Sequence, residues 1–169
     1  MGKDVNIINP DKNEAIQNYY PDDYSHCYGC GRLNKDGLQI KSYWDGNESI
    51  CCFLPEKQYT GGKKGILYGG LIAALIDCHG AATAAAAKAK ELGIEIKKGK
   101  MPRFVTASLK VDYLAPTPVN TELELRGKIK EIKGRKVMVE VNLLVEQKVY
   151  AKGELLFIQL KEYDTGDPW

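Results

Sequence analysis

The stretch that decides the fold is Gly70–Glu91, which reads GLIAALIDCHGAATAAAAKAKE. It is rich in alanine and leucine and has no proline, so it predicts one long helix. Its first four turns are apolar nearly all round, which is typical of a helix buried in a core. Charges gather only near its end, at Lys88, Lys90 and Glu91, where we expect the helix to reach solvent. Gly93 is a natural stop.

Segments with strand character flank this helix on both sides. Two strands are expected before it, at 38–44 and 49–54, joined by a turn at residues 45–47. Four follow it, at 104–114, 122–132, 136–146 and 149–160, with hairpin turns at 133–135 and 146–148. Strict alternation in the first of these places Val105 and Tyr113 on an apolar face and Thr106 on the polar one.

This order of elements predicts the architecture. A single apolar helix needs an apolar surface around it, and a curling antiparallel meander supplies one. A doubly wound fold would need strands and helices in alternation, which the sequence lacks. We therefore expect an α+β fold in which one curved antiparallel sheet wraps a single central helix.

The composition fits one domain. A chain of 169 residues can bury a sizeable core. Its 24 basic and 22 acidic residues are spread along the whole length, which argues against a dedicated nucleic-acid binder. We expect an N-terminal arm at 1–25, the folded domain at 26–162 and a C-terminal tail at 163–169.

Location is predicted from what the sequence lacks. Residues 1–20 contain acidic side chains and no continuous apolar run, so no secretory signal is expected. The most apolar stretch, Leu71–Ala87, is too short and too polar for a comfortable membrane span. Five cysteines, two of them adjacent, do not form a disulfide framework. We expect a cytoplasmic protein with no membrane partner.

Asp77 is the most informative single residue. It is the only formal charge between Gly65 and Lys88, and it lies in the middle of the helix expected to be buried. A buried carboxylate is costly unless it is compensated or protonated, so such positions are often functional. The alternative is a structural aspartate that caps a loop or pairs with a lysine.

Gly69 and Gly70 form the second element of a predicted site. They leave the first N–H groups of the helix unhindered, where its dipole is positive. Such a terminus binds an anion or a carbonyl oxygen that gains negative charge. Gly70 and Asp77 lie roughly 10.5 Å apart along the helix axis, too far to act on one carbonyl. We therefore expect a symmetric dimer with two composite sites.

Three stretches in register carry a family resemblance. They are LYGGLIAALID at 67–77, HCYGCG at 26–31 followed by Asn34 and Gly37-Leu38, and VTASLKVDYLAP at 105–116. Together they resemble PaaI-type thioesterases of the hotdog superfamily, over about residues 25–160. The resemblance implies a hotdog fold, hydrolysis of acyl-CoA thioesters, and a homodimer or a dimer of dimers. It implies no metal and no cofactor apart from the CoA of the substrate.

The resemblance also implies roles for particular residues. The backbone N–H of Gly69 would polarise the thioester carbonyl. Asp77 of the other protomer would act as general base or nucleophile, and Thr106 would orient the water. From the strand pattern alone, an exposed threonine without a role is the other interpretation of Thr106.

Two positions depart from the family pattern. Tyr68 stands where the family usually has histidine, so it can donate a hydrogen bond but cannot take up a proton near neutral pH. Gly62 stands where some members have asparagine. We predict Tyr68, Gly70 and Gly62 as substrate-binding residues, and Lys63 and Lys64 as contacts for CoA phosphates. Arg103 and Lys152 are further basic residues for this role, and a solvated basic surface is the alternative.

Other signals are weaker. His26, Cys27 and Cys30 suggest zinc, but a structural site needs four ligands and the remaining cysteines lack a second paired spacing. We therefore predict no metal. His79 is about 200° around the helix from Asp77, so the two side chains point in different directions. We therefore predict that His79 is a core histidine and not a catalytic partner of Asp77.

Two other function classes stay open. One is a non-catalytic acyl-CoA-binding or regulatory protein, which Tyr68 favours. The other is a hydratase or dehydratase of the hotdog type, which would need an Asp–His pair.

Overall fold

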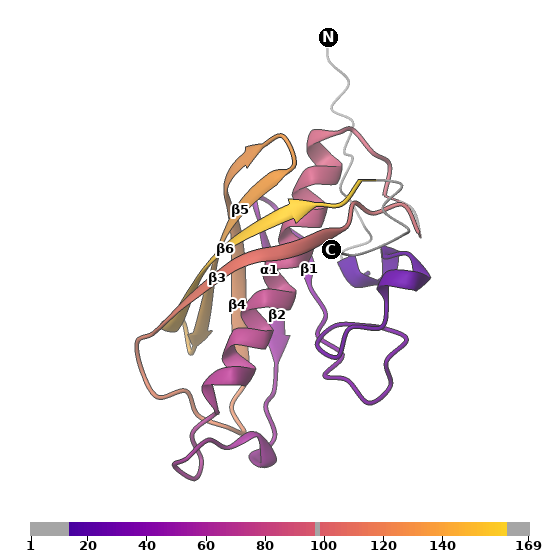
Figure 1. Cartoon of the computed structure of the whole chain (residues 1–169). Helices are drawn as coiled ribbons and strands as arrows, with labels where there is room; N and C mark the ends of the chain where they lie inside the picture. Colours follow the sequence, from indigo (N-terminus) through magenta and orange to yellow (C-terminus); the bar gives the residue numbers. More distant parts are fainter. Residues whose placement is uncertain (1–13, 97–98, 162–169) are drawn as a thin grey trace.

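The computed structural model describes residues 14–96 and 99–161. Six antiparallel strands form one sheet: β1 (Tyr43–Asp45), β2 (Glu48–Phe53), β3 (Phe104–Tyr113), β4 (Leu123–Lys133), β5 (Lys136–Val145) and β6 (Lys148–Gln159). Helix α1 (Gly69–Glu91) crosses its concave face, as Figure 1 shows. Three short 3-10 helices also form: η1 (Ile16–Tyr19), η2 (Asp22–Tyr24) and η3 (Lys57–Tyr59). The predicted architecture of one curved sheet around a central helix is confirmed.

Helix α1 begins one residue earlier than predicted and ends where expected. Gly93 has a φ of 63° and its N–H donates to the carbonyl of Lys90, which closes the helix. Small residues let helix and sheet approach closely: a Cβ on Gly153 of β6 would lie 2.3 Å from the Ile76 side chain. By length and composition the 23-residue helix could span a membrane, but 72% of its apolar window is buried within the fold. The sheet therefore covers most of its apolar surface.

The first predicted strand is wrong over most of its length. Residues 38–42 form no strand, and β1 contains only Tyr43–Asp45. The N–H groups of Leu38 and Ile40 donate to the carbonyls of Tyr28 and Gly29 instead. Gln39 between them has a φ of 54°, which breaks the extended backbone. This segment therefore folds back onto the preceding loop before it enters the sheet.

The sheet order is β1-β2-β4-β5-β6-β3, so β3 is an edge strand. It contains a β-bulge, because Thr106 pairs with Phe157 and Ser108 with the adjacent Leu156, which leaves Ala107 as an extra residue. A bulge reverses the alternation of faces beyond it. The prediction that Thr106 lies on the face opposite Tyr113 was therefore wrong.

Residues 14–25 pack against the end of the domain. Ile16 and Tyr20 belong to the hydrophobic core, and the N–H of Ile16 donates to the carbonyl of Ser42. The rest of the predicted arm, at 1–13, and the predicted tail at 163–169 lie outside the described residues.

Candidate active site

Asp77 lies in the middle of α1 and faces the edge strand β3. The hydroxyl of Thr106 donates a hydrogen bond of 2.7 Å to Oδ1 of Asp77. Burial raises the pKa of Asp77, and the bond from Thr106 opposes this rise. Asp77 is only half-buried and Thr106 is exposed, so the expectation of a fully buried carboxylate was wrong. The pair lies instead at an open edge of the sheet.

The N-terminus of α1 is shaped by its glycines. Tyr68 is the N-cap residue, 44% exposed, and its side chain makes no capping bond. The N–H of Leu71 donates to the carbonyl of Tyr68, whereas those of Gly69 and Gly70 have no acceptor within the helix and can bind an incoming oxygen. A Cβ on Gly69 would lie 3.3 Å from the ring of Tyr113, and one on Gly70 would lie 2.5 Å from the ring of Tyr68. Larger residues would crowd this terminus.

Tyr113 at the end of β3 contacts the same terminus. Its hydroxyl donates a bond of 2.9 Å to the carbonyl of Gly69. Thr106 and Tyr113 thus both face α1, one at Asp77 and the other at Gly69, because the bulge at Ala107 brings them onto one face. Sequence reasoning missed Tyr113, since alternation alone assigned it to the apolar packing face.

An open pocket of about 420 Å³ lies beside Gly69. Its walls are mostly apolar and include Ile66, Leu67, Ile72, Leu114, Ala115 and Pro116. Thr117 also lines it; this residue is 1% exposed, and its Oγ1 has no hydrogen-bond partner among the described residues. None of the described residues that line the pocket is Asp, Glu or His. The pocket therefore lies beside the N–H donors of the helix N-terminus, and its described lining residues include no carboxylate or imidazole that could act as a general base.

The N–H donor at Gly69 and the carboxylate of Asp77 are far apart along α1. Gly69 and Asp77 are eight residues apart in one continuous helix, which corresponds to roughly 12 Å along its axis. A carbonyl bound at the N–H of Gly69 is therefore out of reach of Asp77 in the same chain. The composite site of two chains expected from the sequence stays a prediction.

The predicted substrate contacts Gly62, Lys63 and Lys64 lie in an exposed loop just before α1. The hydroxyl of Thr60 shapes this loop by accepting a bond of 2.8 Å from the N–H of Gly65. Neither lysine forms an ion pair with an acidic side chain of the described residues. Both charges are therefore available to an anion near the helix terminus.

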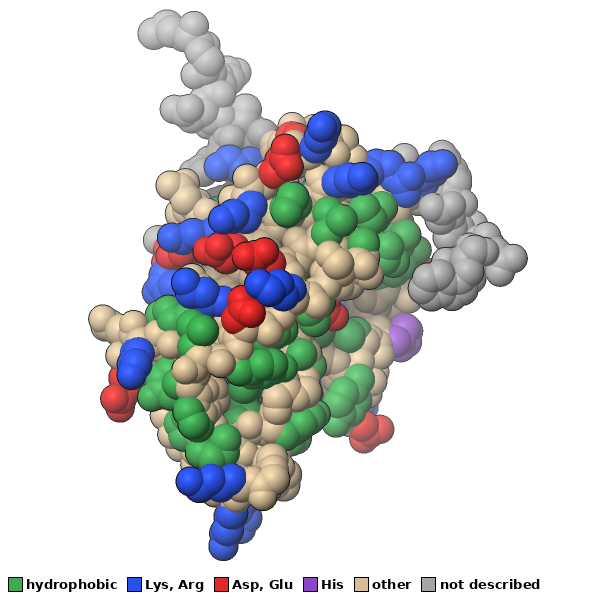
Figure 2. Space-filling model, turned by 60° about the vertical axis from the view of Figure 1, so that its left-hand side comes forward, with side chains coloured by type: hydrophobic (Ala, Val, Ile, Leu, Met, Phe, Trp, Pro, Cys, Tyr) green, Lys and Arg blue, Asp and Glu red, His purple; other side chains and the backbone are tan. Residues whose placement is uncertain are grey.

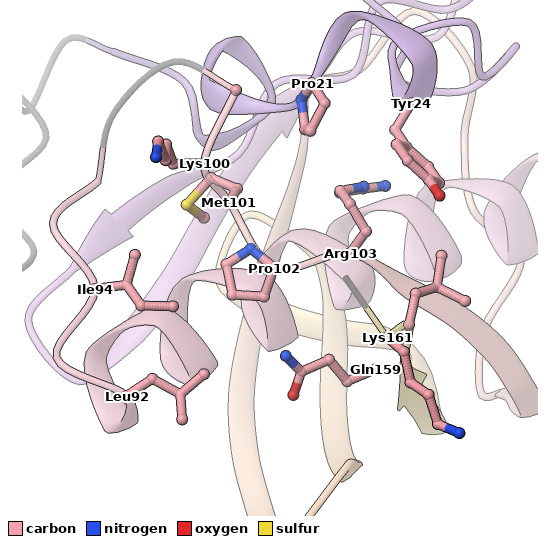
Figure 3. Close-up of a pocket in the computed structure, with 12 residues that line it drawn as sticks. Pro21, Tyr24, Leu92, Ile94, Lys100, Met101, Pro102, Arg103, Gln159 and Lys161 are labelled. Carbon is pink, nitrogen blue, oxygen red and sulfur yellow. The ribbon is translucent and has the colours of Figure 1, made fainter. Parts of the chain in front are cut away.

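The other two basic residues lie elsewhere. The guanidinium of Arg103 lies 3.6 Å from the centre of the Tyr20 ring. It lines a separate pocket of about 270 Å³, where Figure 3 shows it beside Tyr24. Lys152 is exposed on β6 between Ala151 and Gly153, which face the helix, so it points to the outer face of the sheet.

His79 is a core histidine, as predicted. It is 0% exposed, and burial lowers its pKa to about 4. Its Nδ1 lies 2.9 Å from Oγ of Ser42 and its Nε2 lies 3.0 Å from Oγ of Ser49. Both ring nitrogens are occupied, and neither bonds to Asp77. The Asp–His pair of a dehydratase is absent from this part of the described helix.

Comparisons with known proteins agree with this geometry. A family model described as "Thioesterase superfamily" matches residues 64–152. A solved thioesterase superfamily protein from Shewanella loihica is 44% identical, covers 83% of this chain and 98% of its own, and superposes with a TM-score of 0.63. The PaaI protein of Escherichia coli is similar in fold alone, with 14% identity, coverage of 73% and 81%, and a TM-score of 0.60.

A curated relative is the MIOREX complex component 3 of Saccharomyces cerevisiae. It is 29% identical over 119 residues, which are 69% of this chain and 38% of the yeast protein. The chain thus spans well under half the length of that relative. The match of the family model over more than half of the chain decides the assignment. The chain belongs to the thioesterase superfamily, and its curved sheet and central helix are the hotdog fold of that superfamily.

Proposed function

We propose that this protein hydrolyses acyl-CoA thioesters to the free acid and CoA. The observation that carries this proposal is the Asp77 carboxylate at an open sheet edge, held at one oxygen by Thr106. The other oxygen has no recorded partner among the described residues, so it is free to accept a proton from water. Membership of the thioesterase superfamily supports the reaction class.

The helix terminus supplies the second part of the reaction. The thioester carbonyl oxygen would accept a hydrogen bond from the N–H of Gly69, where the helix dipole stabilises developing negative charge. The acyl group would lie in the apolar pocket beside it. Tyr68 and Gly70 flank this position, and Lys63 and Lys64 would contact the phosphates of CoA.

The chemical step follows from these positions. Asp77 takes a proton from water while the water oxygen attacks the thioester carbon, and the carbonyl electrons move to the oxygen at Gly69. The tetrahedral intermediate then expels the sulfur of CoA, which recovers the proton from Asp77. Thr106 positions the carboxylate through its bond to Oδ1. Direct attack by Asp77 as a nucleophile is the alternative first step.

The edge strand β3 supports a dimer. It pairs with β6 on one side only, and it carries exposed apolar side chains, among them Val105 (48%) and Leu109 (37%). An exposed apolar edge of this kind pairs readily with another chain. Figure 2 shows one face of the molecule, on which exposed hydrophobic side chains lie next to a band of basic and acidic ones. Two-fold pairing of β3 would bring Asp77 of one protomer toward the helix terminus of its partner, and a dimer of dimers would preserve these sites.

A second candidate function is acyl-CoA binding without catalysis. The observation that favours it is Tyr68, whose side chain cannot accept a proton near neutral pH. Hydrolysis by this protein would therefore depend on Asp77 alone for proton transfer.

The test is thiol release from a panel of short, long, aryl and hydroxylated acyl-CoAs. We expect turnover of at least one class, and a loss of 10²–10⁴-fold in Asp77→Asn with substrate binding kept. Asp112→Asn is the matched control, because Asp112 is an exposed aspartate paired with Lys110. Tight binding of acyl-CoA without turnover of any thioester would support the binding function and overturn the enzymatic one.

A further inference from the structure

Three cysteine side chains from distant parts of the chain meet beside α1. Cys27 and Cys30 come from the loop before β1, and Cys78 follows Asp77 on the helix. The three Sγ atoms lie within 4.8 Å of one another, and those of Cys27 and Cys78 are 3.8 Å apart although 51 residues separate them. All three are free thiols. The sequence spacing gave no sign of this third sulfur.

The loop is shaped around these sulfur atoms. A Cβ on Gly29 would lie 2.3 Å from Sγ of Cys78, so glycine is required for the loop to approach the helix. The same Cβ would lie 3.7 Å from Sγ of Cys27, so the sulfur atoms of the loop and of the helix lie close together at Gly29. Metal ions bind the thiolate form of cysteine, and each of these three side chains offers one sulfur atom as a ligand.

The surroundings supply compensating positive charge. The cationic side chains of Arg103 and Lys41 both lie close enough to Cys30 to interact with it electrostatically. Nε of Arg103 and the hydroxyl of Tyr20 are both buried, and neither has a hydrogen-bond partner among the described residues. Three thiolates and one divalent cation carry a net charge of about −1, which a neighbouring guanidinium offsets.

We propose that Cys27, Cys30 and Cys78 together bind one thiophilic d¹⁰ metal ion, with Zn²⁺ as the probe that tests it. Sulfur atoms around a tetrahedral zinc ion lie about 3.8 Å apart when each Zn–S bond is about 2.3 Å. The Cys27–Cys78 pair already has this spacing. This proposal departs from the sequence prediction of no metal, which rested on the need for four ligands and on the lack of a second paired spacing among the remaining cysteines.

Three cysteines leave one position of a tetrahedral zinc ion to another ligand. Cys30 and Cys78 are buried, whereas Cys27 is exposed. No described His, Asp or Glu places a ligand atom within the same cluster, so water or a small solute completes the sphere. The ion fastens the 27–30 loop to α1 at the residue after Asp77. Its binding does not depend on whether the protein hydrolyses thioesters.

The test uses the reduced, chelator-treated full-length protein. We expect one Zn²⁺ per chain in a titration against a chromophoric chelator, and thiolate-to-metal charge-transfer absorption when Co²⁺ replaces zinc. Cys27→Ser and Cys78→Ser should each weaken zinc binding by roughly 100-fold, because each removes one of three ligands. Cys52→Ser is the matched control, since Cys52 is exposed and outside the cluster.

Circular dichroism of each variant separates loss of ligand from loss of fold, and the exposed Cys27 can be replaced without disturbing the core. Stoichiometric binding that Cys27→Ser and Cys78→Ser weaken, while Cys52→Ser does not, supports the site. Absence of stoichiometric binding, or equal affinity in all three variants, overturns it.

Discussion

His79 and Asp77 lie two residues apart on α1, but His79 points at Ser49 of β2, near one end of the sheet, and Asp77 points at the edge strand β3 at the other end. The ring of His79 is bonded at both nitrogens by Ser42 and Ser49, and Ser49 is bonded in turn to Thr83. Asp77 has one hydrogen-bond partner among the described residues, Thr106, and is half-buried. One helix thus carries a buried polar network around His79, in which both ring nitrogens are bonded, and a partly exposed pair of Asp77 and Thr106.

The difference teaches where chemistry can occur on this helix. A buried group whose hydrogen-bonding capacity is filled stabilises the fold but has nothing left for a substrate. A half-buried carboxylate with a free oxygen at an unpaired edge can accept a proton from a bound water. Changes at the two residues should therefore separate stability from activity.

The largest expected effect is on activity in Asp77→Asn. We predict that the catalytic efficiency for thioester hydrolysis falls by about 10²–10⁴-fold, because the amide cannot take up the proton from water. The free energy of unfolding should change by no more than about 1 kcal/mol, since the side chain is half-exposed. Thioesterase assays and urea denaturation measure the two quantities. A fall in the free energy of unfolding well beyond about 1 kcal/mol would show that Asp77 has a structural role.

His79→Ala should show the opposite pattern. The substitution opens a cavity and removes one hydrogen bond from each of the buried hydroxyls of Ser42 and Ser49, which costs about 2–4 kcal/mol of unfolding free energy. Activity per folded molecule should be unchanged. His26→Ala, at the exposed histidine, is the control. An active-site role for His79 would appear as lost activity in protein that remains folded.

Thr106 is expected to act on the orientation of the Asp77 carboxylate. Thr106→Val keeps the shape of the side chain but removes the donor to Oδ1, and we predict a loss of about 10-fold in kcat with little change in KM. Thr106→Ser should restore most of the rate, because it keeps the hydroxyl. Equal rates for the valine and serine variants would remove Thr106 from the site.

The smallest predicted effect is that of Tyr113→Phe. It removes the bond to the carbonyl of Gly69 and leaves the ring in place, so the free energy of unfolding should fall by about 0.5–1.5 kcal/mol. Thermal denaturation measures this change. A fall in activity larger than that in stability would indicate that the hydroxyl also contacts the substrate.

Local sequence pattern was sufficient for the helix and for most of the sheet. The alanine-rich run, the stop at Gly93 and the strands after the helix depend on periodicity and turn residues, which a short window contains. The core position of His79 followed from its angle to Asp77 on the same helix. Each of these features is decided by neighbours in the chain.

The features that sequence reasoning missed are set by distant partners. The bulge at Ala107 exists only in the pairing of β3 with β6, and it decides that Thr106 faces Asp77. Residues 38–42 lie outside the sheet, because the N–H groups of Leu38 and Ile40 donate to the carbonyls of Tyr28 and Gly29 in the preceding loop. Cys78 reaches Cys27 only after the helix has packed. None of these three features can be recognised from the residues next to it in the sequence.

The claim that the acid and the N–H donor come from different chains can be tested by mixing two inactive variants. Gly69→Pro removes the donor and suits the first position of a helix, and Tyr68 before it already has the extended backbone that proline favours. Gly69→Ala keeps the N–H and is the control. Asp77→Asn removes the acid.

Equal amounts of Gly69→Pro and Asp77→Asn chains, unfolded and refolded together, should form mixed dimers in half of the cases. Each mixed dimer has one intact site of two, so we predict recovery of about one quarter of the wild-type rate from two nearly inactive proteins. A mixture that stays as inactive as its components would contradict the composite site and place both groups in one chain.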